Sequence, residues 1–492
     1  MRALTLKELF SGYNDVEIPD NIGIDEVFIP TVDQSDTNNN SLLFILDKVG
    51  NGISTQPECT SVDASTIVTS RDRLIKDSKA RVVRVGNARE ALAYALSNTY
   101  AINYDKIKII GITGTNGKTT TASLIYHILQ KAGYSVGFIG TGRIISDNVL
   151  LTSPNYSMTT PDPTLLYRSI SKMIDDGCTY VVMEVSSHSI ALKKVAPIRF
   201  YYSIFTNLGE DHLDFHKDKE EYFHTKLQLF HSTQKGLFNL DDYYVRRAAV
   251  SAPCSKSTFG IIHEADTFAT DICINKLDGS TFFYRENGLI FKAQTNLIGA
   301  FNVYNALAAL KCVIDLGIKP CVAKSALEEI KSVDGRMQFF RGRTNAVIDY
   351  AHTPSAFSNC LKTIKDGINR GQKLIVVFGC GGDRDKRKRP LFGKIAEELA
   401  DKIVICEDNS RGEPFSSIAK DIASGIMGDF EIIQDRESAI KYGFNIANDG
   451  DVVAVIGKGH EKYKLVNNEY IPFDEAKIVL EAQTEAIKRL CE

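Results

Sequence analysis

The segment GITGTNGKTTT, residues 111–121, carries the residue types that bind a phosphate group. Glycines let backbone N–H groups turn toward phosphate oxygens, the start of a helix adds its positive dipole end, and Lys118 adds a point charge. A hydroxyl at Thr119 or Thr120 can hold Mg²⁺. The strict pattern G-x-x-x-x-G-K-[ST] is not met, and the variant here has its first glycine at Gly114. We expect a nucleotide phosphate loop, since a purely structural turn has no need of the lysine and threonines.

Two further segments place acids and histidines directly after apolar runs. MEVSSH carries Glu184, and TNLGEDHLDFH carries Asp211, His212 and Asp214. Open α/β sheets bind their ligands at the carboxyl ends of their strands. A single histidine is more often a structural residue, but both segments behind a phosphate loop favour a magnesium site.

Lys226 lies among apolar residues in KEEYFHTKLQLF, which is typical of an amphipathic helix. By itself this pattern indicates a lysine whose stem covers apolar surface while its ammonium group reaches solvent.

Three loops in the last third of the chain are rich in charge and glycine: FGCGGDRDKRKRP, EDNSRGEP and IGKGHEKY. Each follows an apolar strand, so the basic run DRDKRKR fits a strand-end loop better than a nucleic-acid-binding tail. Together the loops predict a polar pocket for a ligand that carries both charges, such as an amino acid. Its candidate residues are Arg384, Asp408, Asn409, Arg411, Lys458, His460 and Glu461.

The elements that position these residues alternate between apolar strands and helices. Strands are expected at KIKIIGIT, YVVMEVSS, YSIFTNL, AVIDYA, KLIVVFGC, DKIVICED and DVVAVIGKG. TTTASLIYHILQKAG is expected to be a helix that ends at Gly133, and AFNVYNALAALKCVIDLG another. This alternation predicts an α/β fold with parallel sheets that helices cover on both faces.

The length of 492 residues predicts about three domains at roughly 150 residues each. Differences in how apolar runs, loops and helical patterns alternate divide the chain into three segments. Residues 1–105 are expected to form a smaller α/β domain, residues 106–338 a central sheet with the phosphate loop, and residues 339–492 a Rossmann-like domain. The net charge is −3, from 58 basic and 61 acidic residues. A net charge this close to zero argues against a strongly basic surface for nucleic acid. With 43% hydrophobic and 24% charged residues, the chain is a globular protein.

No apolar run approaches the ~20 residues that span a bilayer, and the first residues lack the apolar core of a signal peptide. We therefore expect a cytoplasmic protein without nucleic-acid or membrane partners. The 10 cysteines form no C-x-x-C pair, and the nine histidines form no H-E-x-x-H. The absence of both patterns from the sequence argues against a zinc site, and buried, reduced thiols are expected.

The motifs resemble those of the Mur ligases, ATP-dependent amide-forming enzymes of peptidoglycan synthesis, and most closely the MurE type, which adds the third amino acid. The resemblance covers residues 106–480. It rests, in family order, on GTNGKTT, TTPDP, MEVSSH, FTNLGEDHLDFH, TKLQLF, GAFNVYN, DGRMQ, DYAHTP, FGCGGDRDKRKRP, DNSRGE and GKGHE.

The resemblance implies a role for each matching residue. Lys118, Glu184, His212 and Lys226 match catalytic positions, and magnesium would lie on Thr119, Glu184, His212 and a carbamoylated Lys226. ATP would bind Gly114, Thr115, Asn116, Gly117, Lys118, Thr119, Thr120, Asn302, Arg336, Asp349 and His352. The nucleotide-sugar peptide would contact Thr159, Thr160, Ser186 and Lys194. The incoming amino acid would contact Arg384, Asp408, Asn409, Ser410, Arg411, Gly457 and Glu461.

The implied reaction joins an amino acid to UDP-N-acetylmuramoyl-L-alanyl-D-glutamate through an acyl phosphate, in a monomer that uses ATP and Mg²⁺. Relatives selective for meso-diaminopimelate usually read D-N-P-R, and the tetrad here is Asp408-Asn409-Ser410-Arg411. The retained arginine favours meso-diaminopimelate, because a guanidinium can pair with its second carboxylate. Lysine and ornithine remain alternatives.

The first 105 residues depart from the family, which shows D-S-R and D-G-H-x-F where this chain reads VDQSDT and KVGNGISTQPECT. Leu192 and Lys194 stand where the family often has Gln-x-Arg. These departures leave open a Mur-like ligase with another carboxylate substrate. A nucleotide-binding regulator without catalysis is the third hypothesis, and the retained Lys226 argues against it.

Overall fold

The computed structural model describes residues 1–33, 40–46, 48–50, 53–55, 65–70, 80–153, 156–212, 215–467 and 469–488. The chain divides into two compact units. The first contains Met1–Lys118, Gly133–Leu151 and Met158–Ser257, and the second contains Thr119–Ala132, Thr152–Ser157 and Thr258–Glu492. The three domain ranges expected from the sequence stay a prediction. The described residues contain no helix that is long and apolar enough to cross a membrane.

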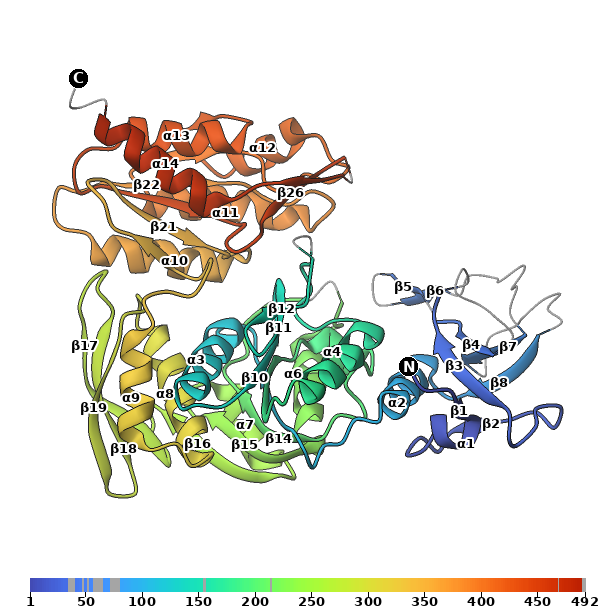
Figure 1. Cartoon of the computed structure of the whole chain (residues 1–492). Helices are drawn as coiled ribbons and strands as arrows, with labels where there is room; N and C mark the ends of the chain where they lie inside the picture. The colour runs from blue at the N-terminus through green and yellow to red at the C-terminus, as the bar shows by residue number, and fades with distance from the viewer. Residues whose placement is uncertain are drawn as a thin grey trace. The chain divides into compact units, whose positions relative to one another are not determined.

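The first unit begins with a six-stranded sheet in the order β1-β3-β4-β7-β8-β2 (Figure 1). Neighbours from β3 to β8 are parallel, and the two outer strands are antiparallel. The elements are β1 (Leu4–Thr5), α1 (Leu6–Leu9), β2 (Val16–Glu17), β3 (Val27–Thr31), β4 (Ser41–Phe44), β7 (Thr66–Ser70), β8 (Arg81–Val85) and α2 (Ala88–Thr99), with a separate pair β5 (Lys48–Gly50) and β6 (Ile53–Thr55).

The phosphate-loop segment of the first unit belongs to an 11-stranded sheet in the order β12-β11-β10-β13-β9-β14-β15-β16-β17-β18-β19. The five strands from β10 to β15 are parallel and almost wholly buried, as their unbroken apolar sequences predict. The strands are β9 (Lys108–Thr113), β10 (Val136–Gly140), β11 (Arg143–Ser146), β12 (Val149–Leu150), β13 (Tyr180–Glu184), β14 (Phe200–Phe205) and β15 (Thr233–Asn239). The helices are α4 (Pro163–Asp175), α5 (Ser187–Ala191), α6 (Lys219–Leu227), the 3₁₀ helix η2 (Gln228–Ser232) and α7 (Tyr243–Ser251).

The helix after the phosphate loop, α3 (Lys118–Lys131), ends before Gly133, whose φ of +89° gives the helix end predicted from the sequence. The β-branched run expected near residues 266–297 forms an antiparallel meander in the second unit. The meander consists of β17 (Thr267–Ile274), β18 (Ser280–Glu286) and β19 (Leu289–Thr295), and α8 (Phe301–Asp315) and α9 (Pro320–Glu329) follow it. The strand before it, β16 (Ser255–Gly260), begins at the end of the first unit and pairs with β17 in parallel.

The last part of the second unit contains a sheet in the order β20-β21-β25-β22-β23-β24, parallel except for the edge strand β20. Its strands are β20 (Gln338–Phe340), β21 (Asn345–Asp349), β22 (Leu374–Phe378), β23 (Lys402–Ile405), β24 (Glu431–Ile432) and β25 (Val452–Ile456). The other elements are α10 (Pro354–Gly367), η3 (Lys386–Lys388), α11 (Arg389–Leu399), α12 (Phe415–Ala423), α13 (Arg436–Asn445), the hairpin β26 (Tyr463–Val466) and β27 (Glu469–Pro472), and α14 (Glu475–Lys488).

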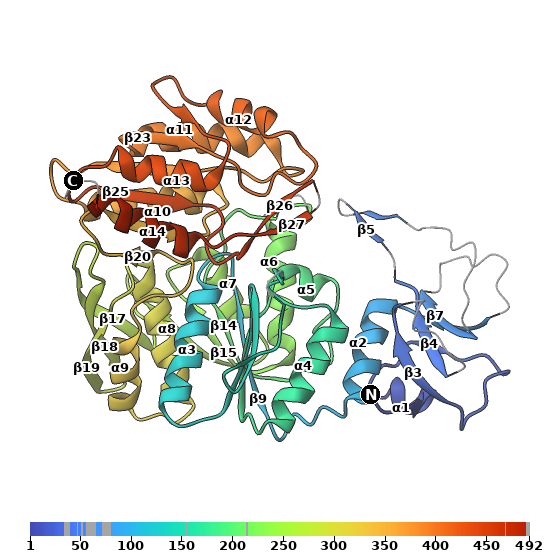
Figure 2. The same ribbon diagram turned by 45° about the horizontal axis from the view of Figure 1, so that its top comes forward.

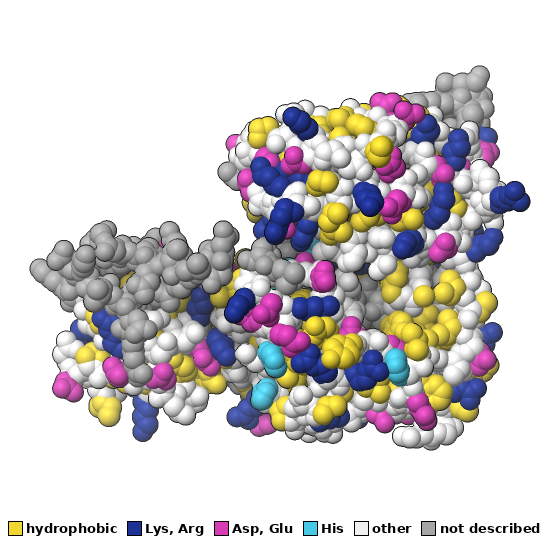
Figure 3. Space-filling view, turned by 180° about the vertical axis from the view of Figure 1, so that it is seen from behind, with side chains coloured by type: hydrophobic (Ala, Val, Ile, Leu, Met, Phe, Trp, Pro, Cys, Tyr) yellow, Lys and Arg dark blue, Asp and Glu magenta, His cyan; other side chains and the backbone are white. Residues whose placement is uncertain are grey.

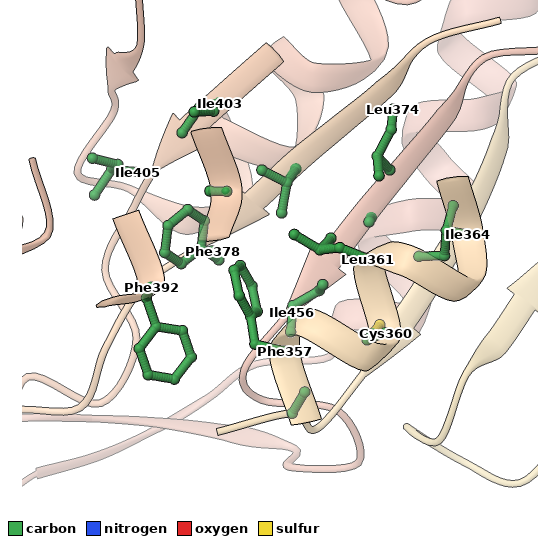
Figure 4. Close-up of a cluster of buried hydrophobic side chains, with 14 of the residues drawn as sticks. Phe357, Cys360, Leu361, Ile364, Leu374, Phe378, Phe392, Ile403, Ile405 and Ile456 are labelled. Atoms are coloured by element: carbon green, nitrogen blue, oxygen red, sulfur yellow. The ribbon is translucent and has the colours of Figure 1, made fainter. Parts of the chain in front are cut away.

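Helices cover both faces of this sheet, because successive side chains of each strand point to opposite faces. Leu374, Val376 and Phe378 of β22 pack with Phe357 and Phe392 from α10 and α11, in the cluster of Figure 4. The alternate β22 residues, Ile375 and Val377, belong to a second core cluster on the other face with residues of α13 and α14. Both helices are labelled in Figure 2. The expected α/β class is confirmed.

Basic and acidic side chains are interspersed on the face of the molecule shown in Figure 3, in keeping with the near-zero net charge. All eight cysteines within the described residues are free, as expected. The expectation of burial is wrong for Cys273 and Cys321, which are exposed. Cys59 and Cys491 lie outside the described residues.

Candidate active site

The predicted phosphate loop is a tight turn between β9 and α3. Gly114 and Gly117 have φ values of +145° and +85°, which L side chains rarely adopt. A Cβ atom on Gly114 would also lie 1.9 Å from the Thr206 hydroxyl oxygen. Glycine is therefore required at Gly114 for both conformation and space.

The chain segment after β14 holds this loop in place. The backbone N–H of Asn116 donates to Asn207 Oδ1 at 2.9 Å, and Asn207 Nδ2 donates to the Asn116 carbonyl at 3.0 Å. The Thr206 hydroxyl donates to the same carbonyl at 2.6 Å, and the N–H of Thr115 donates to the Asn207 carbonyl at 2.9 Å. Contacts within the protein thus fix the loop, and Thr206 and Asn207 are partners that the motifs did not indicate.

Lys118 lies across the mouth of the loop. Its Nζ donates to the carbonyls of Gly114 at 2.9 Å and of Thr115 at 2.8 Å. These contacts place a positive charge at the loop, where an anionic phosphate can replace the carbonyls as its partner.

Lys226, on α6, is buried with 1% of its surface exposed. Its Nζ lies 3.1 Å from the Gly114 carbonyl oxygen, 3.4 Å from Thr113 Oγ1 and 4.6 Å from the centre of the Tyr222 ring. Burial, reinforced by the charge of Lys118, lowers the pKa of Lys226 well below its usual value. The interpretation of a lysine reaching solvent is wrong, because α6 turns this side chain toward the phosphate loop.

Glu184 ends β13 and is fully buried. Its carboxylate accepts from the backbone N–H of Thr141 at 2.9 Å and from the Thr141 hydroxyl at 3.1 Å. The Thr141 hydroxyl oxygen also lies 3.0 Å from Thr159 Oγ1, whose hydroxyl can donate to it. Thr160 donates to the Glu184 carbonyl at 2.9 Å, and its hydroxyl oxygen lies 3.3 Å from Ser186 Oγ. The structure therefore groups Thr159, Thr160 and Ser186 around Glu184, with Thr141 as a member that no motif indicated.

His212 follows β14 in a left-handed backbone conformation, with φ of +55°. Its Nε2 lies 3.4 Å from Asp211 Oδ2, and its ring centre lies 4.7 Å from that of His188. Burial, together with the charges of His188, Lys118 and Lys226, lowers the pKa of His212 to about 4 against the opposing effect of Asp211. The imidazole is therefore neutral at pH 7, the form that binds a metal. Asp214 lies outside the described residues.

The donor set fits the magnesium that the sequence predicts only if Lys226 contributes an anion. No three His, Cys, Asp or Glu side chains of the described ranges cluster closely enough to hold a metal ion. Glu184 supplies a buried carboxylate, and His212 a neutral nitrogen. A neutral Lys226 amine can take up CO₂ as a carbamate, whose oxygens are the hard ligands that Mg²⁺ prefers.

Lys194, expected near a phosphate, instead pairs with Asp162 at 2.6 Å. Its side chain is 12% exposed, and its backbone carbonyl accepts from the Tyr167 hydroxyl at 2.9 Å. A negatively charged ligand would have to compete with Asp162 for this ammonium group.

In the second unit, the start of α3 meets the segment before β20. Arg336 Nη2 donates to Thr119 Oγ1 at 3.1 Å, and the Arg336 guanidinium lies 4.6 Å from the centre of the Tyr350 ring. Thr120 is buried. Asn302 belongs to a buried chain of contacts in which its Oδ1 accepts from Asn305 at 2.8 Å.

Asp349 is the last residue of β21, and its carboxylate contacts backbone groups that precede and follow it in the sequence. Its two oxygens accept from the backbone N–H groups of Met337 at 2.7 Å and Ala351 at 2.8 Å. His352 is exposed, with Nδ1 3.1 Å from the Tyr350 carbonyl oxygen. Asp349 is therefore committed to backbone contacts, whereas His352 can reach a ligand.

The polar residues that the sequence predicts to line a pocket form a cluster around Lys458, which is wholly buried. Its Nζ donates to Asn409 Oδ1 at 2.9 Å and to Glu461 Oε2 at 3.0 Å, and lies 3.6 Å from Asp408 Oδ1. Asn409 Nδ2 also donates to Glu461 Oε2 at 2.8 Å. The loops after β23 and β25 are thus joined by one network. A Cβ on Gly457, which has φ of +124°, would lie 2.9 Å from Asp408 Oδ2.

Arg411 has φ of +53° and turns its guanidinium toward the loop after β22. Its Nη1 donates to the carbonyls of Gly382 at 2.9 Å and Asn409 at 3.2 Å. Ser410, which replaces the proline of the D-N-P-R pattern, is buried, and its hydroxyl donates to Glu407 Oε1 at 2.9 Å. This hydrogen bond restrains the loop where the proline ring is missing.

Arg384 is exposed, and the charged run that contains it is anchored by Arg389, another residue that the motifs did not single out. Arg389 is buried and donates through Nη1 to Glu413 at 2.9 Å and to Asp421 at 2.9 Å. Its Nη2 donates to Glu413 at 2.7 Å. Arg389, at the end of the basic run, is therefore a structural residue.

Sequence comparisons identify relatives for both units. The profile described as Mur ligase middle domain matches residues 112–313, and the profile described as Mur ligase, glutamate ligase domain, matches residues 335–459. The UDP-N-acetylmuramoyl-L-alanyl-D-glutamate–2,6-diaminopimelate ligase of Clostridium botulinum (strain ATCC 19397 / Type A) is 40% identical over 407 residues, covering 81% of this chain and 83% of that protein. The protein of the same name from Clostridioides difficile (strain 630) is 34% identical over 494 residues, covering 97% and 99%.

Comparison with solved structures finds the same kind of relatives as the sequence comparison. A solved structure of a UDP-N-acetylmuramoyl-L-alanyl-D-glutamate–2,6-diaminopimelate ligase matches with a TM-score of 0.66 and 27% identity, covering 98% of this chain and 99% of that one. The MurF ligase of Thermotoga maritima in complex with ADP matches with a TM-score of 0.61 at 18% identity, covering 94% and 98%, and supports the fold alone. The chain therefore belongs to the Mur ligase family of ATP-dependent amide ligases.

Proposed function

We propose that this chain joins meso-diaminopimelate to UDP-N-acetylmuramoyl-L-alanyl-D-glutamate with ATP, the reaction named for its relatives in Clostridium botulinum and Clostridioides difficile. The observation that carries the proposal is the retained Arg411 beside the Lys458 network, in a tetrad that differs from D-N-P-R only at Ser410. The pocket offers a guanidinium for the distal carboxylate and the carboxylates of Asp408 and Glu461 for the ammonium groups.

In the first step, an oxygen of the dipeptide's terminal carboxylate attacks the γ-phosphorus of ATP. The bond between the γ-phosphorus and the β–γ bridging oxygen breaks, giving an acyl phosphate and ADP. Gly114 and Gly117 shape the loop whose backbone N–H groups face the phosphates, and Lys118 neutralises their charge. Glu184, His212, Thr119 and carbamoylated Lys226 would hold Mg²⁺, which supplies charge neutralisation for phosphoryl transfer.

In the second step, an uncharged amino group of the incoming amino acid attacks the acyl carbon. The tetrahedral centre collapses as the carbon–oxygen bond to phosphate breaks, and the amide forms with loss of a proton from nitrogen. The pocket residues Asn409, Arg411 and Glu461 orient the amino acid for this attack. We further propose that the protein acts as a cytoplasmic monomer, where ATP is available.

The test is a panel of the purified chain with ATP, Mg²⁺, the uridine nucleotide dipeptide and one of meso-diaminopimelate, L-lysine or L-ornithine. ADP release and the mass of the product are measured, with reactions that lack the dipeptide as controls. We expect meso-diaminopimelate to give the highest kcat/KM. A preference for lysine or ornithine overturns the amino acid assigned, and no release with any of the three overturns the peptidoglycan reaction.

A second function, amide ligation on another carboxylate, is favoured by the ion pair between Lys194 and Asp162. This pair engages the Lys194 ammonium group that was expected to contact the nucleotide sugar. It predicts ADP release with other carboxylates but not with the uridine nucleotide dipeptide. A nucleotide-binding regulator predicts ATP binding without release on any substrate.

A further inference from the structure

A buried ion pair contacts the chain at the ends of β23 and β25. Arg436 is the first residue of α13 and Glu475 the first of α14, with 0% and 1% of their surfaces exposed. Arg436 Nε donates to Glu475 Oε1 at 2.5 Å. Neither residue belongs to a motif of the family resemblance.

The guanidinium of Arg436 bridges two strand ends. Nη2 donates to the carbonyl of Ile456, the last residue of β25, at 3.0 Å. Nη1 donates to the carbonyl of Glu407, after β23, at 3.4 Å, and lies 3.3 Å from Cys406 Sγ. The residues that follow these two carbonyls directly, Asp408 and Gly457, begin the two loops of the pocket.

A gain in stability does not explain this ion pair well. Glu475 Oε2 is buried and has no hydrogen-bond partner in the structure. Burial raises the pKa of the Glu475 carboxyl in spite of Arg436 and Lys458. Because apolar side chains of similar volume stabilise such a position as well or better, the ion pair is better explained by the geometry that a planar guanidinium imposes.

Lys458 joins the same two loops through side chains, by its contacts with Asn409 and Glu461. The two cations therefore fix the separation of the loops at two levels, at the carbonyls of the strand ends and at the side chains of the pocket.

We propose that Arg436, oriented by Glu475, is a positioning residue that sets the spacing between the Asp408–Arg411 and Gly457–Glu461 segments and thereby the affinity for the incoming amino acid. This inference rests on the proposed function, since it assigns that pocket to the amino acid. Arg436 itself is buried and does not touch the substrate.

The test compares Arg436→Lys, Arg436→Met and Glu475→Gln with the unchanged protein, each measured for KM toward meso-diaminopimelate, ATP and the uridine nucleotide dipeptide. Lysine keeps the charge but cannot bond both carbonyls and Glu475, so we expect a rise in the amino-acid KM of about tenfold for Arg436→Lys and up to about 100-fold for Arg436→Met. The KM for ATP should change less than about threefold. Glu475→Gln keeps an acceptor for Nε and should give the smallest rise.

The matched control is Lys311→Met, which breaks another buried ion pair of the second unit. Lys311 Nζ contacts Glu286 at 2.5 Å and Asp315 at 2.7 Å, and its side chain is 4% exposed. We expect it to lower the melting temperature while leaving the amino-acid KM unchanged.

Two outcomes overturn the inference. One is an Arg436→Lys protein that is folded and active with an unchanged amino-acid KM. The other is an equal rise of all three KM values, which indicates general loss of structure. If Arg436→Met does not fold, the Arg436→Lys and Glu475→Gln proteins decide. Inactivity of the unchanged protein on the amino-acid panel overturns the proposed function instead, so the two failures are distinguishable.

Discussion

The Nζ of Lys226 lies 3.1 Å from the carbonyl oxygen of Gly114, so a buried amine on α6 contacts the first glycine of the phosphate loop. The two residues are 112 positions apart in the sequence. Their contact connects the group proposed to carry a carbamate with the backbone proposed to hold ATP.

Lys226→Arg is expected to reduce kcat by about 100-fold or more, because a guanidinium cannot form the carbamate and leaves a positive charge where an anion is needed. Rates of ADP release measure the loss, and ¹³C NMR of the unchanged protein in labelled bicarbonate should show a carbamate carbon that the variant lacks. Lys235→Met is the control, since Lys235 also lies over a tyrosine ring, at 6.0 Å from Tyr202, but on β15. A Lys226→Arg protein with the unchanged rate contradicts the proposed metal role.

Lys118→Met should lower kcat/KM for ATP by about 100-fold, because the charge that faces the phosphates is lost. The control is Lys108→Met at the start of β9, the strand that precedes the loop, where Lys108 is exposed and lies 4.6 Å from the Tyr201 ring. Initial rates over a range of ATP concentrations separate the two. Equal effects of the two substitutions would refute the assignment of the loop.

Asn207→Ala removes two side-chain hydrogen bonds to Asn116 and should raise the KM for ATP by about 30-fold, since the two bonds contribute about 1 kcal/mol each. Asn207→Asp keeps one acceptor for the Asn116 N–H but adds a negative charge near the phosphates, so it should be worse than alanine. Nucleotide titration by calorimetry measures both. An alanine protein with unchanged ATP affinity means that the loop keeps its shape without Asn207.

Arg411→Met should reduce kcat/KM for meso-diaminopimelate by about 10- to 100-fold, the loss expected for a charge-assisted contact. The value for lysine, which lacks the second carboxylate, should change little, so the ratio between the two substrates is the readout. Arg387→Met is the control from the neighbouring basic run, because the Arg387 side chain is 89% exposed and pairs with Asp385. A parallel fall for both amino acids would assign Arg411 to loop structure instead of selectivity.

Glu413→Gln should flatten the acid side of the stability profile. Hydrogen bonds from Arg389 and Lys386 hold the pKa of Glu413 well below its usual value. A carboxylate with a lowered pKa stabilises the fold above the unfolded value, about 4.3, and loses that contribution as the pH falls toward the folded value.

Melting temperatures of both proteins between about pH 3 and pH 7 test this, with the difference largest near neutrality. Glu220→Gln is the control: Glu220 also pairs with Arg247 through both oxygens, but its side chain is 49% exposed, so a smaller difference is expected. A constant difference at all pH values would mean that Glu413 does not titrate in this range.

The parallel strands and their loops were predictable because continuous apolar runs such as KLIVVFGC identify buried strands, and glycine with charge marks their ends. The family and its ligase activity were predictable from ordered motifs and are confirmed by the comparisons. The roles of individual site residues and the domain ranges stay predictions.

The contacts that hold the site together were not predictable. Asn207 differs in no local feature from other loop asparagines, and its partner Asn116 is 91 residues away. Arg436 and Glu475 each look like an ordinary charged residue at a helix start, and only the fold brings the two helix ends together. The periodicity around Lys226 correctly indicated a helix but gave no information about which polar group the lysine would meet.

Hydrogen bonds from Thr206 and Asn207 hold the phosphate loop, whose Gly114 and Gly117 adopt left-handed backbone conformations. In the proposed function, these contacts within the protein reduce the backbone entropy that the loop loses when ATP binds, a cost of about 1–2 kcal/mol for each residue fixed. Preorganisation of this kind leaves more of the interaction energy of the phosphates for stabilising the transition state.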